Sequence, residues 1–317
     1  MQQDGAGLRI NLMTRAILIT GAGGQLGTEL QRLKWTSAFE PVAMNRSMLD
    51  LEDTNAIANA VTNGHDGNPW GAVVNGAAYT AVDRAESEQV DAWKINALAP
   101  AAFAQVCADA GVPMIQLSTD YVFSGTSANA WNVNDPVDPL NVYGASKLGG
   151  ELAVRSSGSR YAIIRTAWIV SAHGSNFVKT MLRLATEHSR IRVVGDQIGS
   201  PTSAADLAAA VQTIAVAMAE DDAIHSGTFH FSNKGATNWA AFAEEIFRQS
   251  RLRGGPAAEV ETITSADYPT AAVRPTNSLL NHDAIEAEYG IIPRSWAEAI
   301  SDILDELIGM PNNKEIF

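Results

Sequence analysis

Short apolar runs recur along the first half of the chain, each followed or ended by a glycine or a polar residue. Their β-branched residues are typical of buried parallel strands. The runs cover residues 15–20, 41–44, 71–75, 113–118 and 161–165. Helical patterns separate them, with a helix beginning at Thr28 and others at 54–63, 91–110 and 147–156. This alternation predicts an α/β fold with a doubly wound parallel sheet of the Rossmann type.

The pattern changes after residue 170. Helices are expected at 176–187, 206–219, 239–250 and 296–308, and strands at 191–194 and 227–231. Asp206 is placed to cap the second of these helices. We therefore expect a flexible leader over 1–14, a dinucleotide-binding domain over 15–170 plus about 206–235, and a smaller C-terminal substrate-binding lobe over about 171–205 and 236–317.

Composition narrows the classes of partner. The formal net charge is −13, which disfavours a nucleic-acid partner because like charges repel. No segment approaches the roughly 20 apolar residues of a membrane span. The single cysteine, Cys107, rules out an intrachain disulfide and fits a reducing cytoplasm, where we expect the protein to act.

A glycine-rich turn follows the first strand. It reads Gly21-Ala22-Gly23-Gly24-Gln25-Leu26-Gly27 and opens a helix. Gly21 permits a tight turn, Gly24 lets amides approach a pyrophosphate, and Gly27 lets helix and strand pack closely. A helix N-terminus at this point attracts an anion. The turn therefore predicts a bound dinucleotide.

The end of the second strand bears on which dinucleotide binds. NAD enzymes usually place Asp or Glu there, but this strand ends in Met44-Asn45-Arg46. Arg46 can pair with a ribose 2′-phosphate, although it can equally be a solvated surface cation. We expect NADPH, with NADH open as an alternative.

A phenol and an ammonium lie one helical turn apart in Tyr143-Gly144-Ala145-Ser146-Lys147. Reduction of a ketone leaves an alkoxide that must take a proton, and a cation near a tyrosine lowers its pKa towards neutrality. Thr119 ends an earlier strand, where ligands of parallel sheets bind, and can hydrogen-bond a substrate carbonyl. These three residues form the candidate catalytic group.

Other patterns point to structure rather than chemistry. Asp83 and Glu86 have the spacing of a helix capping box. The six histidines show no metal-ligand spacing, and no Gly-x-Ser-x-Gly elbow occurs. A zinc site and a hydrolase triad are therefore not expected.

Several longer motifs resemble one family within the extended short-chain dehydrogenases, the dTDP-4-dehydrorhamnose reductases. The motifs are the turn at 21–27 and the runs 74–83, 118–125, 139–144, 165–168, 176–182 and 196–202. The run Ser118-Thr119-Asp120-Tyr121-Val122-Phe123 distinguishes this group from most sugar-nucleotide epimerases and dehydratases. The resemblance extends from the first strand to near the C-terminus.

The resemblance implies reduction of the C4 ketone of dTDP-4-dehydro-L-rhamnose to dTDP-L-rhamnose. Tyr143 would donate the proton, Lys147 would bind ribose and tune Tyr143, and Thr119 would complete the triad. The resemblance and the residue patterns above together predict these cofactor contacts: Gly21, Gly24, Gln25, Leu26, Gly27, Arg46, Asp50, Leu51, Ala77, Ala78, Tyr79, Thr80, Leu117, Tyr143 and Lys147. The implied substrate contacts are Thr119, Asp120 and Trp168.

The resemblance leaves assembly and sugar identity less defined. Some family members dimerise through a magnesium site, and Glu29 matches one position of it, so the chain is expected to be a monomer or a homodimer with Mg²⁺ as an option. Residues 170–172 lack the tyrosine-glycine expected after Trp168, beside the sugar. The alternatives are a nucleotide-sugar epimerase or dehydratase and a non-catalytic regulatory subunit with this fold.

Overall fold

Six parallel strands form the central sheet of the computed structural model, which describes residues 14–310 of the chain. The expected leader over 1–14 lies outside this range except for Thr14. The strand order is β10-β5-β4-β3-β1-β2, so the chain adds strands on one side of β1 first and then, from β3 on, on the other side. The strands are β1 (Arg15–Thr20), β2 (Phe39–Met44), β3 (Ala72–Asn75), β4 (Met114–Thr119), β5 (Tyr161–Thr166) and β10 (Gly227–His230). The predicted Rossmann-type α/β fold is confirmed.

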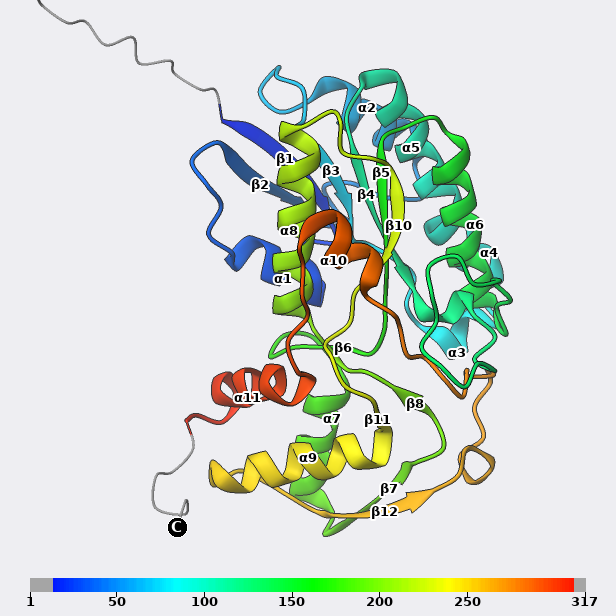
Figure 1. Ribbon diagram of the computed structural model, residues 1–317, viewed down its shortest axis with the longest axis vertical. Coiled ribbons are helices and arrows are strands. Elements are labelled where there is room, and N and C mark those ends of the chain that lie inside the picture. The colour runs from blue at the N-terminus through cyan, green and yellow to red at the C-terminus, as the bar shows by residue number, and fades with distance from the viewer. Residues whose placement is uncertain (1–13, 311–317) are drawn as a thin grey trace, which may run out of the picture.

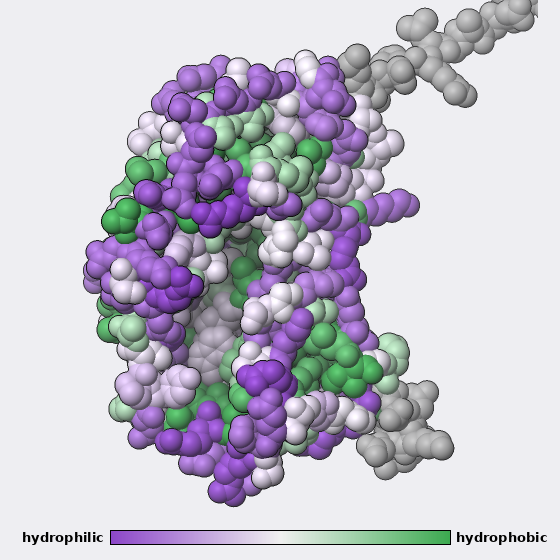
Figure 2. Space-filling view, turned by 180° about the vertical axis from the view of Figure 1, so that it is seen from behind, coloured by the Kyte–Doolittle hydropathy of each residue, from purple (hydrophilic) through white to green (hydrophobic). Residues whose placement is uncertain are grey.

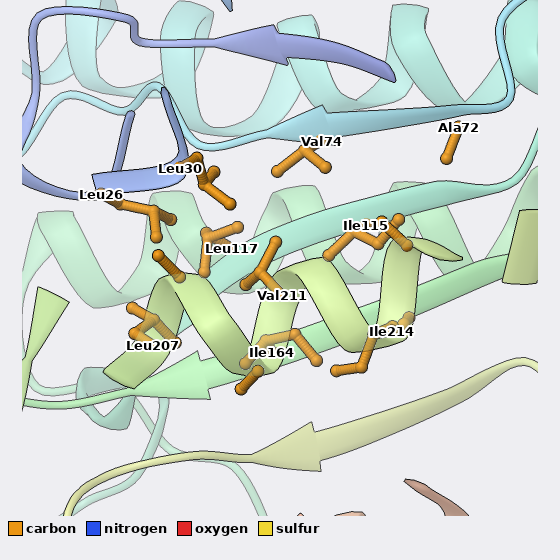
Figure 3. Packing of buried hydrophobic residues seen from close by; sticks show 14 of the residues in the cluster. Leu26, Leu30, Ala72, Val74, Ile115, Leu117, Ile164, Leu207, Val211 and Ile214 are labelled. Atoms are coloured by element: carbon orange, nitrogen blue, oxygen red, sulfur yellow. The ribbon is translucent and has the colours of Figure 1, made fainter. Parts of the chain in front are cut away.

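Helices cover both faces of this sheet (Figure 1). One face packs against α1 (Gln25–Arg32), α8 (Ala204–Glu220) and α10 (Asp283–Tyr289). The other packs against α2 (Thr54–Asn63), α5 (Ala99–Ala110) and α6 (Val142–Ser156). Figure 3 shows the first interface, where Leu207, Val211 and Ile214 of α8 meet apolar side chains of β3, β4 and β5. Both faces being buried explains why these strands are apolar throughout.

A second hydrophobic core lies below the sheet in Figure 1. It is enclosed by α7 (Phe177–Glu187), α9 (Trp239–Leu252) and α11 (Trp296–Leu307), together with the parallel pair β7 (Arg190–Val194) and β12 (Glu259–Ile263). Two short pairs lie between the cores, namely β6 (Ile169–Val170) with β9 (Thr202–Ser203), and β8 (Ile198–Gly199) with β11 (Thr237–Asn238). The surface is hollowed at about this height when seen from behind (Figure 2).

Two helix starts differ from the sequence prediction. The first helix begins at Gln25 rather than Thr28, because the amide of Gly24 already closes the turn on the Gly21 carbonyl at 2.9 Å. The helix expected to be capped by Asp206 begins at Ala204, and Ser203 caps it. Asp206 therefore lies in the first turn, where its carboxylate pairs with Arg294 at 2.9 Å.

The helix expected over 91–110 is divided. It consists of α4 (Gln89–Trp93), a π-helical turn η1 (Lys94–Leu98) and then α5. A π-helical turn inserts one extra residue and often marks a functional site. Among residues 14–310, no helix combines the length and the apolar character that crossing a membrane requires.

Candidate active site

The glycine turn between β1 and α1 has the geometry of an anion cradle. Gly21 adopts φ +81°, which favours glycine, and a Cβ on Gly27 would overlap the carbonyl of Gly21. The amides of Gly21 and Ala22 donate to the Met44 carbonyl at 3.1 and 3.2 Å, which ties the turn to the end of β2. Leu26 anchors the turn by packing into the core (Figure 3). The free N-terminus of α1 is thereby held at the carboxyl edge of the sheet.

A cavity of about 210 Å³ lies beside this turn. Six of the predicted cofactor residues line it, namely Gly21, Arg46, Asp50, Leu51, Ala77 and Ala78. The prediction missed five other lining residues, Thr20, Met44, Asn45, Leu49 and Ile95. Three of these lie at strand ends, because Thr20 ends β1, Met44 ends β2 and Asn45 follows it, and the rule that ligands bind outside the carboxyl ends of strands points to them.

Arg46 lies at the solvent side of the cavity. Its side chain is 73% exposed and pairs with Glu52 at 2.8 Å and with Asp50 at 3.9 Å. Both carboxylate partners are themselves solvent-accessible, so these exposed ion pairs contribute little to holding the guanidinium in place.

Tyr79 and Thr80 lie on the loop after β3, outside the cavity lining. The Tyr79 hydroxyl donates to Glu88 at 2.5 Å, so its phenol is already engaged. Asn96, from the π-helical turn, binds the backbone of Tyr79 with its side chain. Its Oδ1 accepts from the Tyr79 amide at 2.9 Å, and its Nδ2 donates to the Tyr79 carbonyl at 3.0 Å. The same Asn96 side chain donates to Ser146 on α6. No pattern in the sequence predicts this bridge.

Tyr143 and Lys147 both lie on α6. Asn141 caps the helix by accepting from the amide of Gly144 at 2.8 Å. The Glu86 carboxylate accepts from the amide of Val142 at 2.9 Å. The expected Asp83–Glu86 capping box is not formed, because α3 (Val82–Ala85) has only four residues and both carboxylates reach neighbouring segments. The Asp83 carboxylate instead pairs with Arg274 at 2.7 Å.

Thr119, Asp120 and Leu117 come together at the carboxyl end of β4. The Thr119 hydroxyl donates to Asp120 Oδ1 at 3.0 Å, and it lowers the pKa of the neighbouring Tyr143 phenol against the larger effect of burial. The Lys147 ammonium donates to the Leu117 carbonyl at 2.6 Å. Lys147 therefore contacts β4 at Leu117, and Tyr143 lies beside Thr119 at the end of the same strand.

Burial dominates the titration of these groups. It raises the pKa of Tyr143 to about 12, lowers the pKa of Lys147 to about 8, and raises the pKa of Asp120 to about 6. The expectation that Lys147 depresses the pKa of Tyr143 is wrong for this state. The ammonium points to the Leu117 carbonyl instead, and the groups that shift Tyr143 besides burial are Thr119 and Asp120.

Trp168 has an unusual backbone for a residue with a side chain, with φ +49°. Its indole stacks on Trp239 with ring centroids 3.6 Å apart and an angle of 14° between planes. It also packs against Gly199, where an added Cβ would lie 2.6 Å from indole carbons. Trp239 and Gly199 were missed, because their positions along the chain do not indicate contact with residue 168.

Gln25 and Glu29 connect α1 to the segment after Trp168. The side-chain Oε1 of Gln25 accepts from the Ser171 hydroxyl and from the Asn176 side-chain amide, both at 3.0 Å. The Glu29 carboxylate lies 3.7 Å from Arg32 and 3.3 Å from His173. Within residues 14–310, no group of three or more potential ligands comes together to hold a metal. The magnesium site suggested for Glu29 is therefore not supported, because these two side chains occupy its carboxylate.

Comparison with known proteins agrees with this architecture. A family model described as RmlD substrate binding domain matches residues 14–308. A dTDP-4-dehydrorhamnose reductase from Sinorhizobium fredii is 41% identical over 284 residues, which are 89% of this chain and 94% of the relative.

Solved structures agree as well. The crystal structure of dTDP-4-dehydrorhamnose reductase from Bacillus anthracis in complex with NADP has a TM-score of 0.85 at 33% identity, covering 93% of this chain and 100% of that chain. A UDP-glucose 4-epimerase from Brucella ovis, with a TM-score of 0.76 at 16% identity, shares the fold alone. The matches in sequence cover nearly the whole chain, which therefore belongs to the dTDP-4-dehydrorhamnose reductase family of oxidoreductases.

Proposed function

We propose that this protein reduces the C4 ketone of dTDP-4-dehydro-L-rhamnose to dTDP-L-rhamnose with NADPH as the reductant. The observation that carries the proposal is the meeting of Thr119, Tyr143 and Lys147 at the end of β4, at the sheet edge that also bears the cavity of about 210 Å³. A binding protein without chemistry has no need of a half-buried phenol beside a strand-end hydroxyl.

The residues of the cavity fit a nicotinamide dinucleotide. The close approach of Gly27 to Gly21 leaves backbone amides open to a pyrophosphate, and Arg46 is placed to meet a 2′-phosphate. The Bacillus anthracis relative was solved with NADP. When bound, NADPH supplies the hydride. NADH stays open as a second cofactor.

Tyr143 is the proton donor in this proposal. Its raised pKa, about 12, keeps the phenol protonated at neutral pH, which a donor requires. Thr119 orients the substrate carbonyl, and the Lys147 ammonium stabilises the phenolate that forms when the proton leaves. For that last role the Lys147 ammonium, which has three N–H donors, must point one of them towards Tyr143 in addition to the one that the Leu117 carbonyl accepts.

The sugar would lie between the sheet and the second core. Asp120, which is buried and has an unpartnered Oδ2, offers an acceptor to a sugar hydroxyl, and Trp168 offers an apolar face. In this view the cofactor is bound by the domain that comprises residues 15–170 and about 206–235. The sugar is bound by the lobe that comprises about 171–205 and 236–317. The chain would act in the cytoplasm, as its single cysteine suggests. Its state as a monomer or homodimer stays a prediction.

The experiment is the loss of reduced-nicotinamide absorbance with NADPH and dTDP-4-dehydro-L-rhamnose generated in situ. A reaction without this protein is the control. Tyr143→Phe should lower kcat at least about a hundredfold with NADPH binding unchanged, because only the donated proton is lost. Full activity of this variant would refute the assignment of the donor.

The same assay separates the alternatives. An epimerase or dehydratase retains oxidised cofactor through purification and shows no net consumption of NADPH, so both results together would favour it. A folded protein that binds NADPH but turns over no nucleotide sugar would favour the regulatory subunit.

A further inference from the structure

Glu151 lies on the same face of α6 as Tyr143 and Lys147. The three residues are spaced four apart, which places them in one row along the helix. The Glu151 side chain is fully buried. The roles proposed above for Tyr143 and Lys147 leave this carboxylate without a function.

Four hydrogen bonds hold the carboxylate. Ser118 on β4 donates to Oε1 at 2.6 Å, and Arg165 on β5 donates to both oxygens at 2.9 and 2.8 Å. Arg155 on α6 itself donates to Oε2 at 2.9 Å. Ser118 lies between Leu117, the acceptor of the Lys147 ammonium, and Thr119, whose hydroxyl lowers the pKa of Tyr143. Glu151 therefore fastens the catalytic helix to the one stretch of strand that carries its partners.

A buried carboxylate with two guanidinium partners seldom adds net stability. Replacing such a cluster with well-packed apolar residues of similar volume often leaves folding stability unchanged or raises it. A contribution to stability alone therefore explains this cluster poorly. Lys147, one turn away, is 4% exposed, and its ammonium donates to a neutral carbonyl. Burial lowers the pKa of Lys147 to about 8, and the charge of Glu151 acts in the opposite direction.

We propose that Glu151 is a positioning residue that keeps Lys147 charged at the working pH and holds α6 in register with Ser118 and Thr119. The inference rests on the proposed function for its effect on turnover, but its effect on Lys147 is independent of any substrate.

The groups around Lys147 allow this electrostatic account. On α6 they are Tyr143, Glu151 and Arg155, and after β4 there is Asp120. Behind Glu151, β5 contributes Arg165 and β10 contributes His230, which burial keeps neutral with a pKa of about 3. The π-helical turn packed on the other side contributes the neutral Asn96.

The direct test is NMR titration of the lysine Cε signals in the full chain without substrate. The chain has six lysines, and the missing signal in Lys147→Arg assigns the relevant one. In Glu151→Gln the Lys147 midpoint should fall by about one pH unit, since a nearby opposite charge is worth about that much or more. Glu151→Asp, which keeps the charge, should return it towards the parental value.

Arg155→Met is the matched variant, because it removes a cation from the same carboxylate and its side chain is partly exposed. Its Lys147 midpoint should stay or rise. Unchanged midpoints in Glu151→Gln, or a fall in both variants, would overturn the inference. If Glu151→Gln does not fold, Glu151→Asp and Arg155→Met still test the inference. A fall of the Lys147 midpoint in Arg155→Met would contradict the electrostatic account.

Turnover provides the second readout. Protonation of Lys147 should make kcat of Glu151→Gln about threefold lower than the parental value at pH 7.5 and nearly equal at pH 6, for a shift of about one unit. A loss of kcat that is the same at every pH would mean a merely structural role. No turnover by the parental chain would refute the proposed function, while the NMR midpoints would still test the link between Glu151 and Lys147.

Discussion

Gly199→Ala should displace the Trp168 indole and weaken use of the nucleotide sugar. An added Cβ would lie 2.6 Å from Trp168 Cε2 and Cζ2, whereas ordinary contact begins at 3.4 Å. The difference is about 0.8 Å. The backbone at this point is held on two sides, by pairing with β11 and by the hydrogen bond from the Ser278 amide to the Ile198 carbonyl at 2.8 Å. The indole must therefore move, and Trp239 limits its path.

The size of the effect follows from this displacement. A misplacement of about 1 Å in a binding group can cost about a hundredfold in rate. We expect kcat/KM for the nucleotide sugar to fall about tenfold to a hundredfold, which corresponds to about 1.4 to 2.7 kcal/mol. The KM for NADPH should not change, because Gly199 does not line the cofactor cavity. The overpacked side chain should also cost about 1–3 kcal/mol of folding stability.

Steady-state kinetics at saturating NADPH, with thermal unfolding as a check of the fold, measures these effects. Ile198→Ala is the matched control, because Ile198 is the neighbouring residue of β8, is 44% exposed and keeps its backbone pairing in the variant. Parental kcat/KM for the sugar in a folded Gly199→Ala protein would refute the argument that Trp168 is fixed at the sugar site.

Three further variants test other parts of the site. Arg46→Ala should raise KM for NADPH more than for NADH in steady-state kinetics, and an equal rise would mean that Arg46 does not meet a 2′-phosphate. Asp120→Asn should raise the free energy of unfolding at pH 7.5 by up to about 3 kcal/mol. The sign follows because burial raises the pKa of Asp120 from 3.8 to about 6, so protonation favours folding, and that contribution is complete below about pH 4 and is lost as pH rises through 6. The gain in chemical denaturation should therefore vanish at pH 4, and its persistence there would contradict the reasoning. Gly144→Ala should lower kcat about a hundredfold, because the added Cβ would overlap the Tyr121 carbonyl and push the start of α6 from Thr119; kcat within twofold of the parental value would show that α6 absorbs the clash.

The sequence predicts those parts of the site that arise from local patterning. The glycine turn, the strand that ends in Thr119 and the helical spacing of Tyr143 and Lys147 each depend on a few neighbouring residues. The rule for parallel sheets then brings their strand ends to one edge. The fold class follows from the same alternation of strands and helices.

Other features depend on packing between distant segments. Asn96 reaches Tyr79 because a π-helical turn interrupts a helix whose apolar pattern is continuous in the sequence. Trp239 meets Trp168 only after the second core has formed. The direction of the Lys147 ammonium depends on how deeply α6 is buried against β4. The four-residue spacing of Tyr143 and Lys147 in the sequence does not predict that depth.

The path of the chain has a consequence for how enzymes of this shape diversify. After β5 the chain enters the second core, returns for α8 and β10, leaves again, and returns once more for α10 before ending in α11 (Figure 1). A single genetic crossover that exchanged the C-terminal half would therefore also replace an edge strand and two of the helices that cover one face of the sheet with foreign ones that must pack on the old strands. We expect chimaeras of that kind to fail to fold, so that a new choice of sugar on this scaffold arises by substitutions within loops such as 168–176 rather than by exchange of modules.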